Sequence, residues 1–214
     1  MFTDAHGTVT AEEGDRYPLK PPIIWSRLER LFFMSNIYLS SDPHFGHENI
    51  LKFTKSDGSP LRVFEDATHM NEYMVMQHNR VVQPNDKWYC LGDLAMHKKF
   101  LPILNRMNGE KILIRGNHDT ENASEYLKYF KDVRGSHQLE GMLLTHIPIH
   151  PESLSRWKAN IHGHLHSNRV MVRGFNNKPV EIDHRYYSVC MEQLDDYTPV
   201  SIEQVKKNVL EATS

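Results

Sequence analysis

Short apolar runs recur along the chain from Asn36 onward, separated by longer stretches in which apolar residues return at helical spacing. Runs of three or four apolar residues closed by glycine or polar residues are typical of buried β-strands, and the stretches between them indicate helices. The expected strands are 37–39, 88–91, 112–114, 142–145, 160–161, 170–172 and 186–192. The expected helices are one that Asp66 caps and that reaches Val81, then 100–107, 121–130 and 202–210.

The alternation of strands and helices predicts an α/β fold. Asp93, Asn117 and His146 each follow an apolar run at intervals of 24 and 29 residues, close to the roughly 30-residue length of a β-α-β unit. Ligands of such folds bind beyond the carboxyl ends of the strands. Polar side chains that end successive strands should therefore converge on one rim. The stretch from Val170 onward lacks such endings and is expected to complete a second sheet or an edge.

The first 33 residues differ from the rest of the chain. Glycine and proline punctuate residues 1–22, which show little apolar periodicity, and residues 24–32 carry apolar side chains at helical spacing. We expect residues 1–33 to be an accessory or flexible extension, with an interaction arm as the alternative. Residues 34–214 are expected to form the domain.

The composition excludes several classes of protein. The 214 residues carry 25 basic and 27 acidic side chains, for a formal charge of -2, which argues against a protein that coats nucleic acid or an anionic membrane. No apolar run approaches the roughly 18 residues of a membrane span, and the start lacks the order of a signal peptide. Two cysteines are too few for a disulfide framework, so we expect a cytoplasmic protein. Histidine, with 14 residues, is unusually frequent.

Seven polar residues at the strand ends form a candidate metal site. They supply carboxylate, amide and imidazole donors and no thiolate, a set that suits Mn²⁺, Fe, Ni²⁺ or Zn²⁺. Seven ligands are too many for one tetrahedral ion and are enough for two ions when one carboxylate bridges them. Paired ions of this kind usually serve displacement at phosphorus. The seven residues are Asp42, His44, Asp93, Asn117, His146, His164 and His166.

Five motifs that contain these residues follow one another in a particular order. Within residues 36 to about 192, this ordered set resembles the calcineurin-like metallophosphoesterase superfamily. The resemblance implies an α/β fold in which helices flank a two-sheet β-sandwich. The motifs are Asp42-x-His44, Gly92-Asp93, Gly116-Asn117-His118-Asp119, His146 and Gly163-His164-x-His166.

The resemblance also divides the seven ligands between two divalent ions. One ion would be held by Asp42, His44 and His166. The other would be held by Asn117, His146 and His164, with Asp93 as the bridge. Manganese is the expected metal, with iron, nickel or zinc as alternatives.

Further residues are expected to act on the substrate. By the resemblance, His118 would stabilise charge on the phosphate or protonate the leaving group, and Asp119 would orient His118. Arg115 and His47 are expected to contact substrate phosphate, the alternatives being an exposed strand-end arginine and a histidine that caps a turn. The insertion at residues 52–65 would form a lid or substrate wall, or else a plain surface loop.

The function implied by the resemblance is that of a metal-dependent phosphoric ester hydrolase that uses a metal-bridging hydroxide. Gly92-Asp93 continues with Leu94-Ala95-Met96-His97, so the arginine that grips a terminal phosphate in protein phosphatases of the superfamily is missing. We therefore expect a phosphodiester or phosphomonoester of a small molecule such as a nucleotide, with phosphodiesterase activity favoured. A nuclease on DNA or RNA is the alternative. A non-catalytic binding scaffold is the third hypothesis, which the complete ligand set disfavours.

Overall fold

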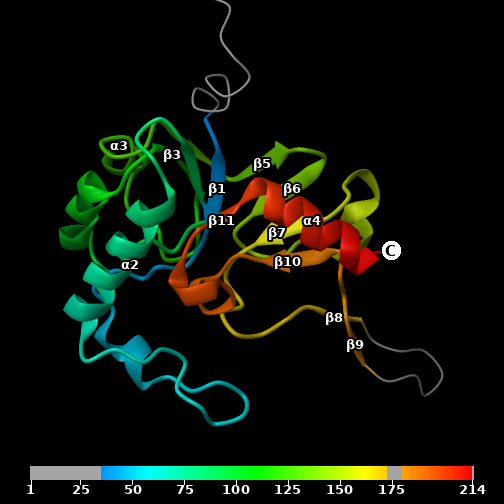
Figure 1. Ribbon diagram of the computed structural model, residues 1–214, viewed down its shortest axis with the longest axis horizontal. Helices are drawn as coiled ribbons and strands as arrows, with labels where there is room; N and C mark the ends of the chain where they lie inside the picture. The colour runs from blue at the N-terminus through cyan, green and yellow to red at the C-terminus, as the bar shows by residue number, and fades with distance from the viewer. Residues whose placement is uncertain (1–34, 173–179, 214) are drawn as a thin grey trace, which may run out of the picture. The chain divides into compact units, whose positions relative to one another are not determined.

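The computed structural model describes residues 35–172 and 180–213, and within them it has two main sheets flanked by helices (Figure 1). The α/β class expected from the alternating pattern is confirmed. The predicted N-terminal extension, residues 1–33, lies outside the described residues.

The first sheet has five strands in the order β11-β1-β2-β3-β4. Strands β1 to β4 run parallel, whereas β11 pairs antiparallel with β1. The apolar runs predict β1, β2 and β3. They do not predict β4 or β11, which are short and only half-buried and so contain no apolar run. The bounds are β1 Ile37–Ser40, β2 Lys87–Cys90, β3 Glu110–Ile114, β4 Asp132–Arg134 and β11 Val200–Ser201.

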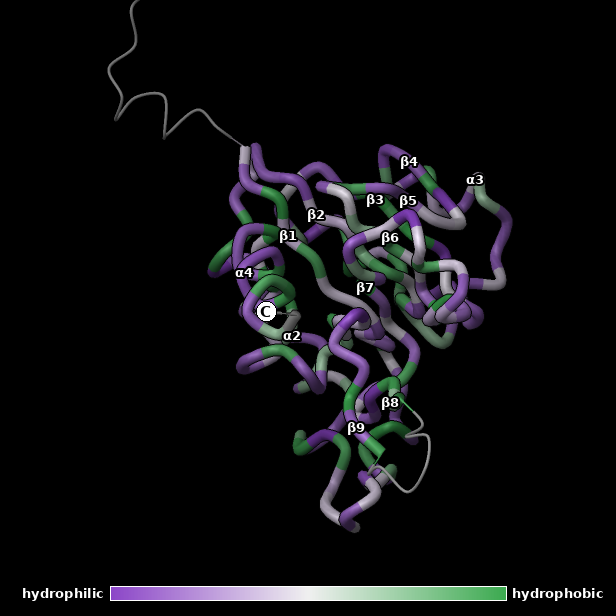
Figure 2. Tube along the Cα trace, turned by 90° about the vertical axis from the view of Figure 1, so that its right-hand side faces the viewer, coloured by the Kyte–Doolittle hydropathy of each residue, from purple (hydrophilic) through white to green (hydrophobic). Residues whose placement is uncertain are grey.

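The second sheet has four strands in the order β10-β7-β6-β5. Strands β6, β7 and β10 run parallel, and β5 pairs antiparallel with β6. The C-terminal stretch thus completes the second sheet as expected, although β10 ends before residue 192. A separate ribbon is made of β8 (Met171–Val172) and β9 (Glu181–Ile182) and includes hydrophobic residues (Figure 2), of which Met171, Val172 and Ile182 are exposed. The other bounds are β5 Ser136–Leu139, β6 Met142–Thr145, β7 Asn160–His162 and β10 Tyr186–Ser188.

In the part of the chain that the structure describes, the strands are accompanied by three α-helices and several 3₁₀ helices. Helix α2 (Ala67–Val81) begins as predicted at Asp66, whose carboxylate accepts a hydrogen bond from the His69 amide. The segment expected to be a helix over 100–107 forms the 3₁₀ helix η2 (Lys98–Arg106). It contains Pro102, which has no backbone N–H and so cannot make the hydrogen bond that the interior of an α-helix requires. The helix expected over 121–130 contracts to α3 (Ala123–Tyr126), and the last helix is α4 (Ile202–Thr213).

The remaining 3₁₀ helices are η1 (Glu48–Lys52), η3 (Pro151–Arg156), η4 (Met191–Gln193) and η5 (Asp195–Tyr197). Among the described helices, none combines the length and the apolar character that crossing a membrane requires.

Two apolar layers lie on opposite faces of the first sheet (Figure 1). Successive residues of a strand point to opposite faces, so Trp88 and Cys90 of β2 pack with α2 and η2. Tyr89, between them, joins Leu144 of β6 and Ile161 of β7 in the other layer, to which α4 also contributes. The two sheets therefore share one apolar core.

The two sheets meet at the carboxyl ends of β1 and β10. Ser41 and Cys190 form a parallel bridge, in which the Ser41 amide donates to the Val189 carbonyl and the Met191 amide donates to the Ser41 carbonyl. This connection draws the ends of both sheets together. The polar residues that follow β1, β2, β6 and β7 consequently gather at one rim, as the sequence predicts.

Acid is expected to lower the stability of the fold through His78, which lies between the first sheet and α2. Its ring packs on Trp88 at 4.7 Å, and its Nε2 lies 2.9 Å from the Asn108 carbonyl oxygen. Burial lowers the pKa of His78 to about 4, so between pH 6.5 and 4 the unfolded chain binds this proton more readily than the folded one. Stability should fall by about 2 kcal/mol between pH 7 and pH 5 through this residue. In urea unfolding at both pH values, His78→Gln should lose less stability than the unsubstituted protein; equal losses would contradict the assignment.

Candidate metal centre

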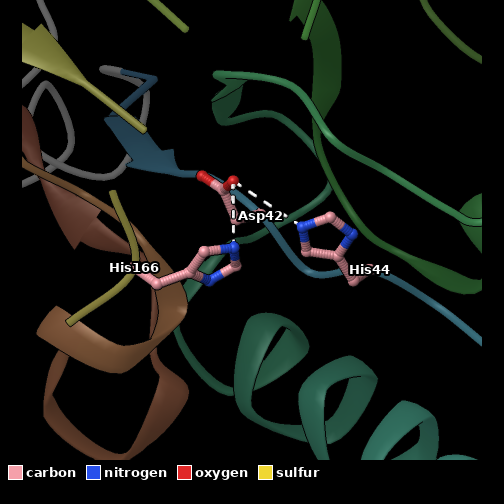
Figure 3. A group of neighbouring side chains, drawn as sticks. All are labelled: Asp42, His44 and His166. Carbon is pink, nitrogen blue, oxygen red and sulfur yellow. Dashed lines mark ion pairs between the residues drawn. The ribbon is translucent and has the colours of Figure 1, made fainter. Parts of the chain in front are cut away.

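Asp42, His44 and His166 form the first of two donor clusters. Asp42 and His44 follow β1, and His166 lies in the loop after β7. Asp42 Oδ1 is 3.8 Å from His44 Nε2 and 4.0 Å from His166 Nε2, with the three side chains directed toward one another (Figure 3). Two ligand atoms that each lie about 2.1 Å from one ion can be at most about 4.2 Å apart. Both separations are therefore within reach of a single ion.

Asp93, His146 and His164 form the second cluster. They follow β2, β6 and β7 respectively. His146 Nε2 lies 3.4 Å from Asp93 Oδ2 and 2.9 Å from Oδ1 of Asn117, the other ligand predicted for this ion. His146 Nδ1 donates to the Leu91 carbonyl oxygen at 2.7 Å, so Nε2 is the ring nitrogen that faces the cluster.

Asp93 lies between the two clusters. Its Oδ2 is 3.7 Å from His44 Nε2 in the first cluster and 3.4 Å from His146 Nε2 in the second. Its Oδ1 accepts from the His118 amide at 2.8 Å. One carboxylate oxygen is thus anchored by the backbone and the other faces both clusters, which is the position that a bridging ligand requires. The two clusters together fit a dinuclear site.

The backbone of the ligand loops adopts a strained conformation. Positive φ is uncommon for residues other than glycine and costs on the order of 1 kcal/mol or more at each position. Eight non-glycine residues among those the structure describes have positive φ, and five of them are predicted ligands. Such strain collects where function requires a fixed geometry. The five are Asp42 (61°), His44 (50°), Asp93 (54°), His164 (70°) and His166 (49°).

Two glycines let the ligand loops pack directly on one another. A Cβ at Gly163 would lie 2.9 Å from Ser41 Cβ and would overlap the side-chain oxygens of Ser41 and Asp42. A Cβ at Gly116 would lie 2.5 Å from the Asp93 amide nitrogen. Both separations are shorter than non-bonded contact allows, so neither position has room for a side chain.

Three buried metal-ligand atoms of the first cluster have no hydrogen-bond partner among the residues that the structure describes. They are Asp42 Oδ1 and both ring nitrogens of His44. Buried polar atoms are normally paired, and each unpaired one costs roughly 1 to 3 kcal/mol. A divalent cation would satisfy Asp42 Oδ1 and one His44 nitrogen at once, so these residues fit a metal ion.

Burial determines the protonation of the first cluster. It lowers the pKa of His44 to about 2, which keeps the imidazole neutral, the form that binds a metal. Burial also raises the pKa of Asp42, because the charges of His146 and His166 do not offset the lost hydration. In the second cluster burial acts in the same sense on Asp93, but the hydrogen bond and charge of His146 outweigh it and lower the pKa of Asp93. Cations at the clusters would favour the ionised form of both carboxylates.

Sequence reasoning missed two charged side chains behind the first cluster. Arg62 donates to the carbonyl oxygens of Asp42 and Pro43 and to Glu192, and Glu192 Oε1 lies 3.0 Å from His166 Nδ1. Burial opposes ionisation of Glu192, but the Arg62 guanidinium and His166 lower its pKa to about 2. Arg62 lies in the loop between η1 and α2, and Glu192 lies in η4. Neither residue belongs to one of the five motifs, so the sequence gives no signal for them.

Asp119 binds backbone amides through both of its carboxylate oxygens. Asp119 Oδ2 accepts from the amides of Asp93 and Gly116 at 2.9 and 2.8 Å, and Oδ1 accepts from the Leu94 amide at 3.0 Å. Asp119 therefore joins the loops after β2 and β3, and the orientation of His118 by Asp119 stays a prediction. His118 itself is exposed, with its ring centroid 5.6 Å from that of His44.

The two residues expected to contact phosphate lie in different environments. Arg115 is exposed and donates to the carbonyl oxygens of Asp119 and Glu121, both at 2.6 Å, so its guanidinium supports its own loop, and its contact with substrate phosphate stays a prediction. His47 is half-buried beside the first cluster, with its ring centroid 5.7 Å from that of His44. Its contact with substrate stays a prediction.

Comparisons with known proteins find relatives and structural neighbours. No family model matches the chain. The protein of unknown function AQ665 from Aquifex aeolicus has a solved structure that matches with a TM-score of 0.59 and 26% identity, over 81% of this chain and 99% of that one. Vps29 from Entamoeba histolytica matches with a TM-score of 0.36 and 15% identity over 72% of each chain, a likeness too weak to carry an argument.

A curated relative is similar along most of its length. The uncharacterized protein MJ1445 of Methanocaldococcus jannaschii is 32% identical over 178 residues, which cover 81% of this chain and 91% of that protein. At this identity and coverage, the chain belongs to the same family as MJ1445 of Methanocaldococcus jannaschii.

Proposed function

We propose that the protein is a metal-dependent phosphoesterase with a dinuclear centre, a member of the calcineurin-like metallophosphoesterase superfamily. The observation that carries this proposal is the position of Asp93 Oδ2, within 3.7 Å of one donor cluster and 3.4 Å of the other at a single rim. The ordered motifs support the superfamily. The apolar core that the two sheets share supports the two-sheet β-sandwich of that fold.

Two bound divalent ions would activate a water molecule as nucleophile and neutralise charge on the phosphoryl group. The side chains hold the geometry around them. Asp42 and Asp93 each have one oxygen fixed by a backbone amide, of His164 and His118 respectively, so the other oxygen keeps its direction. Because Asp93 binds the His118 amide, it also positions the imidazole that would stabilise the phosphate or protonate the leaving oxygen. Mn²⁺ is the proposed metal, with iron, Ni²⁺ and Zn²⁺ as alternatives.

His118→Ala is expected to lower kcat by about 10²-fold to 10⁴-fold, the usual contribution of a general acid, while both metal ions stay bound. Steady-state kinetics together with elemental analysis of metal measure the two effects. The matched control is His184→Ala, which removes an exposed histidine in the turn before β10 and should change neither quantity. Loss of metal in His118→Ala would show that His118 is a ligand and would contradict its proposed role.

Two adjoining cavities beside the clusters support a diester substrate. A cavity of about 190 Å³ is lined by His118, and one of about 360 Å³ is lined by His47; both are also lined by Met96 and His97. A phosphodiester carries an ester group on each side of phosphorus, and the two cavities offer a place for each. None of the seven predicted ligands lines either cavity or the larger cavities that border α4, so the link to the clusters is made by His118 and His47, whose rings lie beside that of His44.

Hydrolysis of nitrophenyl esters in the presence of Mn²⁺ tests the proposal. We expect bis(p-nitrophenyl) phosphate to be hydrolysed with a higher kcat/KM than p-nitrophenyl phosphate, and a chelator to stop both reactions. Protein that binds two metal ions and hydrolyses neither ester would refute the proposed function. A preference for the monoester would refute the diester assignment alone. Cyclic nucleotides, dinucleoside polyphosphates and short nucleic acids would then define the natural substrate, the last of these testing the nuclease alternative.

A further inference from the structure

Arg62 is a buried arginine in the loop between η1 and α2. Arg62 is 1% exposed, and all three nitrogens of its guanidinium donate hydrogen bonds. Nη2 donates to the Asp42 carbonyl oxygen at 2.6 Å, Nη1 donates to the Pro43 carbonyl oxygen at 2.8 Å, and Nε donates to Glu192 Oε1 at 2.7 Å. The Met70 sulfur of α2 lies 3.5 Å from Nη1. A side chain held by this many contacts has one conformation, so it can fix the positions of the groups to which it donates.

The two carbonyl groups that Arg62 binds belong to the strained segment of the first cluster. Asp42 and His44 have φ of 61° and 50°, and the carbonyl oxygens of Asp42 and Pro43 lie between these two positions. The left-handed conformation is unfavourable for both residue types, so it persists only where surrounding contacts enforce it. Arg62 supplies two such contacts by fixing consecutive peptide groups.

Glu192 extends the same network to His166. Its side chain is 1% exposed, and its Oε1 lies 2.7 Å from Arg62 and 3.0 Å from His166 Nδ1. A carboxylate only accepts, so Nδ1 of His166 donates and Nε2 keeps its lone pair. That Nε2 is the atom directed at Asp42 Oδ1 (Figure 3). A carboxylate behind a histidine ligand commonly orients the ring and raises its basicity.

We propose that Arg62 and Glu192 are positioning residues that set the geometry of the Asp42, His44 and His166 cluster for a divalent metal ion. This inference rests on the proposed function, because it assumes that the cluster binds metal. One arginine and one carboxylate connect three ligands: Asp42 and His44 through the peptide groups that Arg62 binds, and His166 through its ring. The insertion at residues 52–65, expected to form a lid or surface loop, thus contributes a buried support for the centre.

The charges of the pair suit this role. A lone guanidinium behind the cluster would repel a cation, and Glu192 neutralises it at 2.7 Å. A lysine could not replace Arg62, because one ammonium group cannot donate in the same plane toward two carbonyl groups and a carboxylate. Loss of either partner should therefore weaken the first cluster, whose Asp42 and His166 bind them, and leave the second, with which neither side chain forms a hydrogen bond among the described residues.

Titration with Co²⁺, followed by its absorption spectrum, tests the proposal in the full chain. Arg62→Lys is expected to weaken one of two Co²⁺ equivalents by about 10-fold to 100-fold and to change its spectrum, while the other equivalent is unaffected. The matched control is Arg185→Lys. Arg185 also pairs with a carboxylate, since its Nη2 lies 2.6 Å from Asp183 Oδ2, but its side chain is half exposed and neither residue belongs to the donor clusters. Its titration should match that of the unsubstituted protein.

Glu192→Gln provides a second variant that keeps the volume and an acceptor for His166. It is expected to weaken the same Co²⁺ equivalent by about 10-fold, and it decides the question if Arg62→Lys does not fold. Unchanged affinity and spectrum of both equivalents in a folded variant would overturn the inference alone. Absence of Co²⁺ binding by the unsubstituted protein would overturn the proposed function and the inference together.

Discussion

Asp93→Ala is expected to abolish hydrolysis of a phosphodiester, lowering kcat by at least about a thousandfold, and to release metal from both clusters. The reason is that Asp93 Oδ2 serves two clusters at once, lying 3.7 Å from His44 Nε2 and 3.4 Å from His146 Nε2. The same carboxylate holds the His118 amide at 2.8 Å, so its removal also loosens the residue proposed to act on the substrate. The assay is Mn²⁺-dependent hydrolysis of bis(p-nitrophenyl) phosphate beside elemental analysis of the purified variant.

Asp132→Ala is the matched control for this substitution. Asp132, on β4, pairs with Arg134 at 2.6 Å in a partly exposed ion pair, and such pairs contribute little to stability. Turnover and metal content should therefore be unchanged. If Asp93→Ala kept two metal ions and measurable turnover, Asp93 could not be the bridge, and the bridging role argued from its position would have to be abandoned.

The central strands could be predicted from the sequence because burial on both faces makes them apolar throughout. The run Trp88-Tyr89-Cys90 is an example: Trp88 and Cys90 enter one apolar layer, and Tyr89 enters the other. Strand β5 could not be found in this way. Its burial alternates between exposed and intermediate, and its residues Ser136, His137 and Gln138 are polar. Such a strand is determined by pairing with β6, which is a tertiary effect.

The ligands could be predicted because each follows an apolar run, and the carboxyl ends of the strands of both sheets converge at one rim. Their supports could not. Arg62 and Glu192 are 130 residues apart in the chain and occur in no motif, so only the folded structure brings them together. Asp119 shows the complementary difficulty: its motif position was evident, but its partners are backbone amides of other loops, and those depend on how the loops pack.

The backbone conformation of the ligand loops also escapes the sequence. Positive φ favours glycine, yet Asp42, His44 and His166 adopt it. Local preference and the folded structure disagree at these positions, which is expected where a functional geometry is maintained against a local cost.

Gly163→Ala is expected to disrupt both clusters and to destabilise the fold by roughly 1 to 3 kcal/mol, the usual range for overpacking. Its new methyl group would overlap the side-chain oxygens of Ser41 and Asp42, so the segment after β7 would have to move. That segment carries His164, whose amide donates to Asp42 Oδ2 at 2.9 Å, and His166 of the first cluster. Thermal unfolding should show a decrease in Tm on the order of 5 °C, and metal analysis should show loss of both ions.

Gly135→Ala separates this steric effect from the general cost of replacing glycine. A Cβ at Gly135 would meet no atom within 4 Å, and its φ is not positive, so alanine should be accommodated there with metal content and Tm little changed. A Gly163→Ala variant that matched this control in both measurements would mean that the loops after β1 and β7 can separate without cost. The donor separations of 3.8 to 4.0 Å in the first cluster would then not be enforced by packing, and the preformed metal site argued from them would be wrong.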